Sequence, residues 1–339
     1  EGRFSVALEA AKKYGFSQQV YECVYQKAWT DFYWYDDPDS SLEGYLCLKS
    51  MLQEDVNVVR IEKLYNLYRL LVTSSGQGMM TKDFNHQGEQ RYMETLCSRL
   101  EDNPAKPSCA LFLKICLLED KLIESLQEKA DLTDISDVLH QLKEAIQNAS
   151  HHLSINFESQ AEVLVNIGGL IGESREFDEL IDVVSKIQSD CSSDISAANI
   201  QYERGVQLLG AQRFENAVKH LSKSYVLYHK ENTITELVRT SGFLGKSYSE
   251  MDLLYSAKTY YIRALSILIN DVGNNGRSDH LIVTILIELC LLEIRLGQIA
   301  SVLEWLAMLD AIVSTVQEYL NDDFLRERSR IDALLGARI

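Results

Sequence analysis

Proline is scarce in this sequence, with three residues among 339, at Pro38, Pro104 and Pro107. A chain of this length with ordinary usage would carry about 17. Because proline lacks the backbone N–H and its ring clashes with the preceding turn, helix interiors exclude it. The scarcity therefore favours an all-α protein, and it counts against a turn-rich β-sandwich or barrel.

Runs of basic residues are also lacking. The chain has 33 Lys and Arg against 50 Asp and Glu, a formal net charge of −17 at pH 7, and no basic run longer than Lys12–Lys13. Proteins that bind nucleic acids neutralise phosphates with basic patches, so this balance argues against direct binding to nucleic acid or to an anionic membrane. Solubility accounts for the acidity, and a basic partner is the alternative.

The seven cysteines form no C-x-x-C pair, and their odd number is typical of reduced, buried thiols in a cytosolic protein. The most apolar stretch, Leu281–Leu296, contains two glutamates and is too short to span a bilayer. No signal peptide is visible, so we expect a cytoplasmic protein with no membrane partner. Because the first residue is Glu1 rather than Met, we also expect a piece of a longer chain.

Motifs that carry catalysis or bind metals are missing as well. The segment Gly273–Gly276 lacks the Gly-Lys-Ser/Thr of a phosphate-binding loop and is expected to be a turn between helices. The seven histidines show no metal-ligand spacing and are expected at the surface. The carboxylate pair Glu119-Asp120 is expected to be solvated. We predict a protein that is not an enzyme, with no catalytic residue, no metal and no cofactor.

What the sequence does have is an internal repeat of 40 residues, between Ile200–Tyr225 and Thr240–Leu265. The aligned pairs are Gly205 with Gly245, Leu208 with Tyr248, Phe214 with Leu254, Ala217 with Ala257, Leu221 with Tyr261, and Ser224 with Ala264. Bulky residues match bulky ones and small residues match small ones. The spacings place these residues on facing stripes of two helices, and a glycine permits the helices to approach closely.

Weaker copies flank this pair, one from Gly168 to Ile187 and one from Cys290 to Leu309, with Gly168, Gly169 and Gly172 interpreted as helix-packing glycines. We expect three regions: an irregular helical-repeat region over 1–160, a regular array over 161–315, and a C-terminal capping helix within 316–339. Predicted helices outside the regular copies are Val6–Tyr14, Tyr21–Tyr35, Leu42–Met51, Val58–Val72, Gln90–Leu100, Ser108–Lys129, Ile135–Leu153, Leu303–Leu320 and Phe324–Leu335. Thr73–Gly88 is predicted as a loop, and Asn321 as the N-cap of the last helix.

The order of small, aromatic, alanine and small residues in the two strong copies resembles the tetratricopeptide (TPR) family. That resemblance implies a right-handed superhelical solenoid of antiparallel helix pairs, acting as a non-catalytic scaffold or sensor module that binds proteins or peptides. Repeats of 37 to 45 residues exceed the usual 34 and are similar to those of bacterial regulatory and sensor arrays. The alternative is a ligand- or peptide-responsive regulator whose array changes conformation to control an attached signal-transduction NTPase or transcription regulator.

In that family the first helix of each pair lines a concave groove, where a protein or peptide segment binds. The resemblance assigns five residues here to partner binding: Asn199, Tyr202, Arg239, Lys246 and Ser249. The chaperone-type carboxylate clamp is absent, because its positions hold Tyr202, Val206 and Phe243. Arg239 and Lys246 can still hold a peptide carboxylate, and the equal alternative is that they are solvated surface cations.

The aromatic run near residue 30 is the most unusual local feature. Trp29, Phe32 and Tyr33 share a helical stripe and are expected in the core. Trp34 and Tyr35 then point elsewhere, and one of them is a possible aromatic anchor for a partner. The alternative is that these residues have a packing role only.

Overall fold

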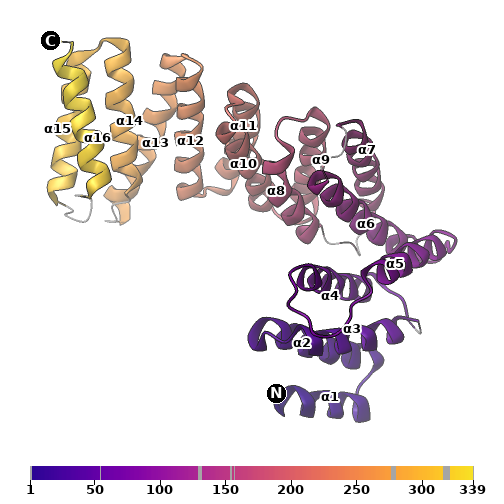
Figure 1. The fold of residues 1–339 in the computed structure, drawn as a ribbon. Helices are drawn as coiled ribbons and strands as arrows, with labels where there is room; N and C mark the ends of the chain where they lie inside the picture. The colour runs from indigo at the N-terminus through magenta and orange to yellow at the C-terminus, as the bar shows by residue number, and fades with distance from the viewer. Residues whose placement is uncertain are drawn as a thin grey trace. The chain divides into compact units, whose positions relative to one another are not determined.

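The structure, a computed structural model, describes residues 2–53, 55–128, 132–152, 155, 157–275, 280–315 and 321–338. These residues form sixteen α-helices and no strand (Figure 1). The chain divides into two compact units, Glu1–Asn156 (unit 1) and Phe157–Ile339 (unit 2). No helix in the described part of the chain is long and apolar enough to cross a bilayer.

The helices of unit 1 are α1 (Gly2–Tyr14), α2 (Ser17–Tyr35), α3 (Pro38–Leu52), α4 (Val58–Gly76), α5 (His86–Glu101), α6 (Pro107–Gln127) and α7 (Leu132–Ala149). Helix α1 packs on α2, α2 pairs with α3, and α6 contacts both α5 and α7. Helix α4 contacts α2 and α6, so alternate helices form one layer. The predicted helices Tyr21–Tyr35 and Leu42–Met51 correspond to α2 and α3. The predicted loop is partly wrong, because α4 continues to Gly76 and α5 begins at His86.

Buried tyrosines and a buried arginine connect helices within the largely apolar core of unit 1. The Tyr21 hydroxyl donates to the carbonyl of Arg60 (2.8 Å), and the Tyr45 hydroxyl donates to the carboxylate of Glu89 (2.7 Å). The Arg60 side chain is 1% exposed, and its guanidinium donates to Ser17 (2.8 Å) among other neutral groups. Tyrosine hydroxyls and guanidinium groups thus join helices that lie 39 to 44 residues apart in sequence.

The expectation that Glu119 and Asp120 are solvated is wrong. Glu119 lies in the middle of α6 with no exposed surface, and the Arg69 guanidinium donates to Glu119 and to Asp120 at 2.8 Å each. Tyr65 also donates to Asp120. Burial raises the pKa of Glu119 to about 7, although Arg69 acts in the opposite direction. Glu119 is fully buried and Asp120 partly so, because Arg69 of α4, about 50 residues earlier in the chain, contacts both carboxylates.

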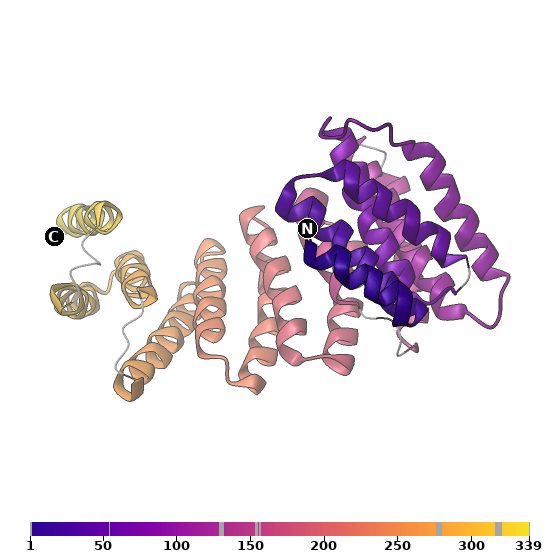
Figure 2. The ribbon, with the colours of Figure 1, turned by 90° about the horizontal axis from the view of Figure 1, so that it is seen from below.

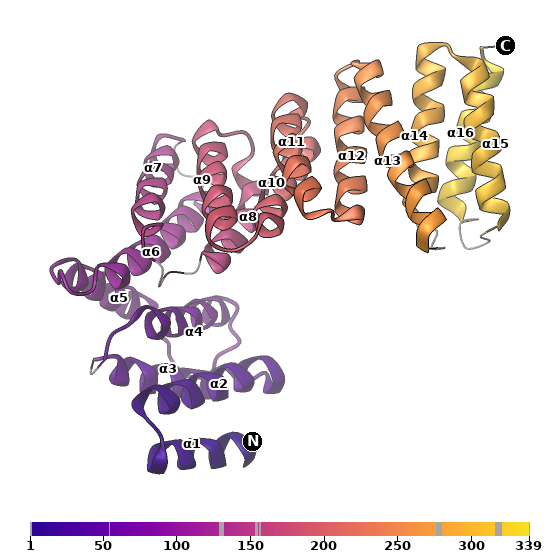
Figure 3. The same ribbon diagram turned by 180° about the vertical axis from the view of Figure 1, so that it is seen from behind.

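The helices of unit 2 are α8 (Glu158–Ile171), α9 (Arg175–Cys191), α10 (Asp194–Gly210), α11 (Phe214–Glu231), α12 (Ile234–Glu250), α13 (Leu254–Asn275), α14 (Leu281–Leu296), α15 (Ile299–Thr315) and α16 (Asp322–Gly336). The even-numbered helices are called A helices, and α8, α10, α12 and α14 each pack on the odd-numbered helix that follows, called a B helix. Each A helix also contacts the next A helix, so the A helices form one layer of the array. Figures 1 and 3 show α10 to α15 side by side from two opposite directions.

The strong repeat register is explained by the crossing of A and B helices. A Cβ atom on Gly205 would lie 2.6 Å from Leu221 Cγ, and one on Gly245 would lie 2.7 Å from the Tyr261 ring. Leu221 and Tyr261 are themselves an aligned pair, and each lies 16 residues after its glycine. The glycines are therefore required by close helix approach, as predicted.

The weaker copies are less uniform. A Cβ on Gly168 would meet the side chain of Gln207, so this glycine does pack, whereas Gly169 faces open space. Gly172 has φ +67°, a left-handed conformation that follows the last residue of α8. The interpretation of Gly169 and Gly172 as packing glycines is wrong. Cys290, in the last copy, is fully buried in an apolar cluster, as expected.

The C-terminal end agrees with the sequence in part. Asn321 accepts a hydrogen bond from the Phe324 N–H (2.9 Å), which confirms the predicted N-cap of α16. Helix α14 contacts both α15 and α16, which Figure 2 shows nearly end-on in gold and yellow. The predicted turn at Gly273–Gly276 is wrong over 273–275, since α13 runs to Asn275, and residue 276 lies outside the described residues. So do residues 129, 153 and 316–320 of the predicted helices.

A buried arginine ties three helices of unit 2 together. The Arg204 side chain, 1% exposed, donates to Asp178 on α9 (2.8 Å) and to the carbonyls of Gly168 (2.9 Å) and Gly172 (2.6 Å) at the end of α8. His220 Nε2 lies 3.5 Å from the same carboxylate, and His220 is buried, so its expected surface position is wrong. Burial alone would raise the pKa of Asp178, but hydrogen bonds from His220 and Arg204 outweigh it and lower that pKa.

Candidate functional site

Three successive A helices of unit 2, together with Tyr261 of the B helix α13, line one open cavity of about 340 Å³. Its polar lining combines side chains from α10, α12 and α14, and its floor is apolar. The polar residues are Tyr202, Arg239, Lys246, Thr284 and Glu288, and the floor is Val238, Gly242, Phe243, Tyr261, Leu281 and Ile285. We call this cavity the A-helix groove.

Three of the five residues assigned from the sequence meet in this groove: Tyr202, Arg239 and Lys246. The other two do not line it. Asn199 accepts a hydrogen bond from the Tyr228 hydroxyl (2.5 Å). Ser249 accepts one from Arg295, whose Nη1 lies 2.6 Å from the serine hydroxyl oxygen. Ser249 is therefore occupied by a residue 46 positions later in the chain.

Arg239 and Lys246 are both exposed, and they lie seven residues apart on α12, which is two helical turns. Within the described residues neither forms a hydrogen bond or an ion pair. Several other cations of unit 2 are paired, for example Arg204 with Asp178 and Lys223 with Asp182 (2.6 Å). The A-helix groove thus carries two unpaired positive charges in a chain whose formal net charge is −17.

Glu288 is a groove residue that the sequence interpretation missed. It lies four residues after Thr284 on α14, hence on the same helical face, and that spacing was the available signal. Burial raises the pKa of Glu288, and Lys246 acts in the opposite direction. The Tyr261 hydroxyl donates to Glu288 at 3.4 Å.

Apolar and aromatic groups continue the groove beyond Lys246. The rings of Tyr202 and Phe243 meet edge to face, with centroids 5.8 Å apart. Phe243 and Lys246 also line a neighbouring cavity of about 380 Å³, together with Val206, Phe214 and Glu250. The two cavities can accept apolar side chains on either side of Phe243, and Lys246 lines both of them.

The predicted aromatic anchor lies in unit 1. Trp34 is 81% exposed and Tyr35 is 55% exposed. Tyr33 is equally exposed, and Trp29 and Phe32 are only half-buried, so the expected core stripe is wrong. The Trp29 and Tyr33 rings instead contact each other on α2 in a tilted arrangement, with centroids 4.8 Å apart. The role of Trp34 and Tyr35 as an anchor stays a prediction.

No group of three or more His, Cys, Asp or Glu side chains that could hold a metal ion occurs in the described part of the chain. The cysteines there are all free, and Cys47 and Cys191 are exposed, so the expectation of buried thiols is wrong for these two.

Sequential A and B helices, with each A helix against the next, define the fold as a TPR-like α-solenoid. Similar solved structures include the apo form of RapI, at 13% identity and a TM-score of 0.43, covering 99% of this chain and 85% of that one. Others are a Rap protein complexed with competence and sporulation factor (10%, TM-score 0.40, covering 95% and 88%) and BtubC from P. vanneervenii (13%, TM-score 0.41, covering 71% and 95%). No protein-family model matches the chain, and no curated protein matches it.

Proposed function

We propose that this chain is a non-catalytic binding module that holds a peptide or an extended protein segment in the A-helix groove. One observation carries the proposal. Two exposed cations that form no ion pair among the described residues, Arg239 and Lys246, line an open cavity whose other lining residues are largely apolar. Open cavities with an apolar floor and a few convergent polar groups are the usual form of binding sites.

The chemistry of the groove favours a segment with an acidic group beside an apolar side chain. A guanidinium can hold a carboxylate with two parallel hydrogen bonds, whereas an ammonium acts as a compact point charge. Arg239 is thus the group that fixes a carboxylate, and Lys246 adds attraction. The apolar side chain would pack on Phe243 and Ile285, away from water.

The test uses labelled peptides that differ at one position, Asp or Asn, beside a leucine. With the full chain, we expect the Asp peptide to bind more tightly, and changing both Arg239 and Lys246 to Ala to weaken its binding about tenfold or more. Lys186→Ala is the matched control, because Lys186 is an exposed cation on α9 outside the groove. Equal affinity of the double variant and the unaltered chain in calorimetry would reject this site.

A second candidate is a regulator that changes conformation around its ligand and controls an attached effector domain. The observation in its favour is that residues from three successive A helices line the groove, so a bound segment would bridge neighbouring repeats. Small-angle scattering with and without the Asp peptide tests this candidate. A change in the radius of gyration supports it, and identical curves at saturation count against it.

A further inference from the structure

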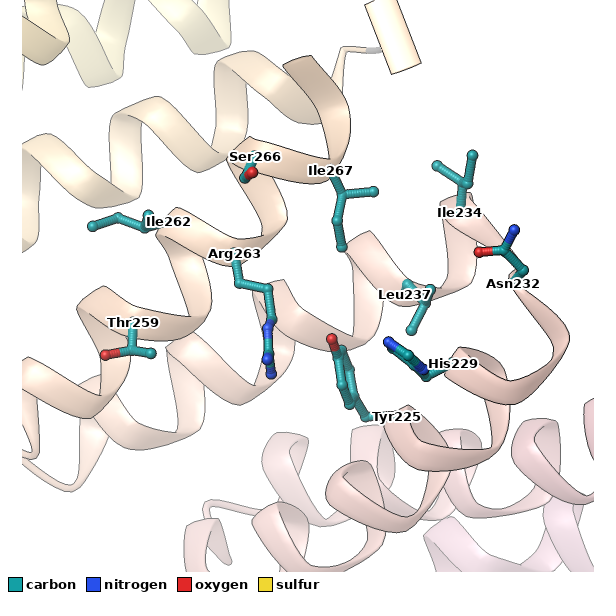
Figure 4. A pocket seen from close by; sticks show the side chains of 10 residues that line it. All are labelled: Tyr225, His229, Asn232, Ile234, Leu237, Thr259, Ile262, Arg263, Ser266 and Ile267. Atoms are coloured by element: carbon teal, nitrogen blue, oxygen red, sulfur yellow. The ribbon is translucent and has the colours of Figure 1, made fainter. Parts of the chain in front are cut away.

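A second concave surface of unit 2 lies between the B helices α11 and α13, over the first turns of α12. Figure 4 shows this surface, a cavity of about 500 Å³ that we call the B-helix groove. Side chains from both helices flank it: Tyr225 and His229 from α11, and Arg263 and Ile267 from α13, with buried Leu237 at its base. None of these residues lines the A-helix groove.

The charge of the B-helix groove is opposite to that of the whole chain. Its lining contains Arg263 and His229 and no carboxylate. Between Leu254 and Asn270, α13 carries Lys258 and Arg263 and no acidic residue. Lys258 is paired with Glu293 (2.6 Å), whereas the Arg263 guanidinium lies 5.2 Å from the ring centroid of Tyr225, without an ion pair in the described residues. Arg263 is therefore available to a carboxylate.

The outer face of α13 carries an exposed apolar stripe with a seven-residue period. Tyr255 is 69% exposed, Ile262 is 39% exposed and Ile269 is 42% exposed. The exposed residues Thr259 and Ser266 lie between them on the same stripe. This spacing is that of the contact positions of paired helices, and fourteen residues at 1.5 Å each extend it over about 21 Å. Ile262, Thr259 and Ser266 also line the B-helix groove, so stripe and groove form one surface.

We propose that this surface docks an amphipathic, acidic helix of a partner protein. Apolar residues of the partner at heptad spacing would pack along Tyr255, Ile262 and Ile269. A carboxylate on its flank would meet Arg263 over the Tyr225 ring. The seven-residue period favours a helical partner over an extended segment. Arg263, in a lining that contains no carboxylate, favours an acidic partner.

A second copy of this chain fits the surface less well. A two-fold contact uses the same patch on both partners, so pairing two α13 stripes around Ile262 would bring the two Arg263 side chains together. Like charges facing each other across an interface are destabilising. The acidic helix is favoured for this reason.

The experiment measures fluorescence anisotropy of labelled synthetic helices of about three heptads with the full chain. One peptide has leucine at the contact positions and glutamate on the flanks, a second has lysine in place of glutamate, and a third has the leucines scrambled. We expect the glutamate helix to bind, and the other two to bind at least about tenfold more weakly. Arg263→Glu should weaken the glutamate helix about tenfold or more and strengthen the lysine helix.

Two controls separate this site from the rest of the molecule. Lys186→Glu makes the same charge change at an exposed residue of α9 and should leave binding of the helix unchanged. The Arg239 and Lys246 double variant should also bind the helix normally, so loss of the A-helix groove and loss of this site are distinguishable. The far-UV circular dichroism of each variant checks that the fold is retained.

Three results would overturn the proposal. The first is equal binding of the glutamate and lysine helices, and the second is unchanged binding of the glutamate helix to the Arg263→Glu variant. The third is a dimer in sedimentation that dissociates in an Ile262→Glu variant, which would assign the surface to a second copy.

Discussion

The two units differ in which helix of a pair carries the glycine at the helix crossing. In unit 2 the A helix supplies a glycine, and a large residue 16 positions later crosses it: Gly205 with Leu221, and Gly245 with Tyr261. In unit 1 the 16-residue relation occurs between Ala28 on α2 and Gly44 on α3, where a Cβ on the glycine would lie 2.5 Å from Ala28 Cβ. In unit 1 the glycine thus lies on the second helix and faces a small residue, whereas in unit 2 it lies on the first helix and faces a large one.

The units also differ in what surrounds their buried arginines. Arg60 in unit 1 and Arg204 in unit 2 have side chains that are each 1% exposed. Arg60 donates to neutral groups, with the exposed Asp55 carboxylate 3.5 Å away, whereas Arg204 contacts the mostly buried carboxylate of Asp178. The loss of stability on removing a buried arginine therefore depends on whether a buried carboxylate is left without its partner.

The largest expected effect comes from removing these arginines. Arg204→Met should lower the free energy of unfolding by about 3–5 kcal/mol, because it leaves Asp178 without its guanidinium partner. Arg60→Met should cost less, about 1–3 kcal/mol, because it removes hydrogen bonds to neutral groups and an ion pair whose carboxylate, on Asp55, is exposed to water. Urea denaturation followed by Trp305 fluorescence, with Trp29 and Trp34 replaced by Phe, measures the loss in unit 2 for Arg204→Met. Trp29 fluorescence, with Trp34 and Trp305 replaced by Phe, measures the loss in unit 1 for Arg60→Met. Equal losses for the two variants would contradict the distinction.

The glycine positions provide the next test. Gly205→Ala and Gly245→Ala should each destabilise by about 1–2 kcal/mol, because overpacking at the helix crossing exceeds the better helix propensity of alanine. Gly169→Ala is the matched control in the same unit: its Cβ meets open space, so a gain of about 0.5–1 kcal/mol is expected. Thermal unfolding of the three variants measures these changes. Stabilisation by all three would show that the crossings tolerate a methyl group.

A smaller effect is expected from pH in unit 1. The pKa of Glu119 is raised from 4.5 to about 7 by burial, so the folded state holds its proton more tightly than the unfolded state. The free energy of unfolding should therefore fall as the pH rises from about 4.5 to about 7. Glu119→Gln should flatten this part of the profile, measured by urea titrations at pH 5 and pH 8. Glu128→Gln, at an exposed residue just beyond α6, should retain it.

The smallest effect is expected at the exposed aromatic run. Trp34→Ala should change the free energy of unfolding by no more than about 0.5 kcal/mol, because the side chain is 81% exposed. Acrylamide quenching of Trp34 in a variant with Trp29 and Trp305 replaced by Phe measures its accessibility. Weak quenching in the isolated chain would contradict the exposed position, and protection by a partner would support the predicted anchor.

The sequence was sufficient wherever the determining contact is local or periodic. Helix periodicity, the Asn321 cap and the 40-residue register of Gly205 and Gly245 all depend on residues within one hairpin, and these predictions are confirmed. Of the site, the three groove residues that meet were assigned from the resemblance to the TPR family. An alignment based on a glycine in the first helix could not detect Gly44, which plays the complementary role.

What the sequence could not provide are the contacts between distant helices. Glu119 forms an ion pair with Arg69, 50 residues earlier, and the Ser249 hydroxyl accepts a hydrogen bond from Arg295, 46 residues later. No local pattern marks such partners, since a buried charge and a solvated one look the same in sequence. The partner is defined only when the helices are stacked.

The contacts of Arg204 affect how the repeats of unit 2 unfold. It belongs to α10, but the groups that it binds belong to α8 and α9, so its energy is a nearest-neighbour coupling rather than part of either hairpin. In a linear array, a strong coupling of this kind makes adjacent repeats melt as one block, and a weak one lets a terminal repeat fray alone. In such a one-dimensional lattice, we expect Arg204 to make α8, α9 and α10 unfold together, rather than letting α8 and α9 unfold alone.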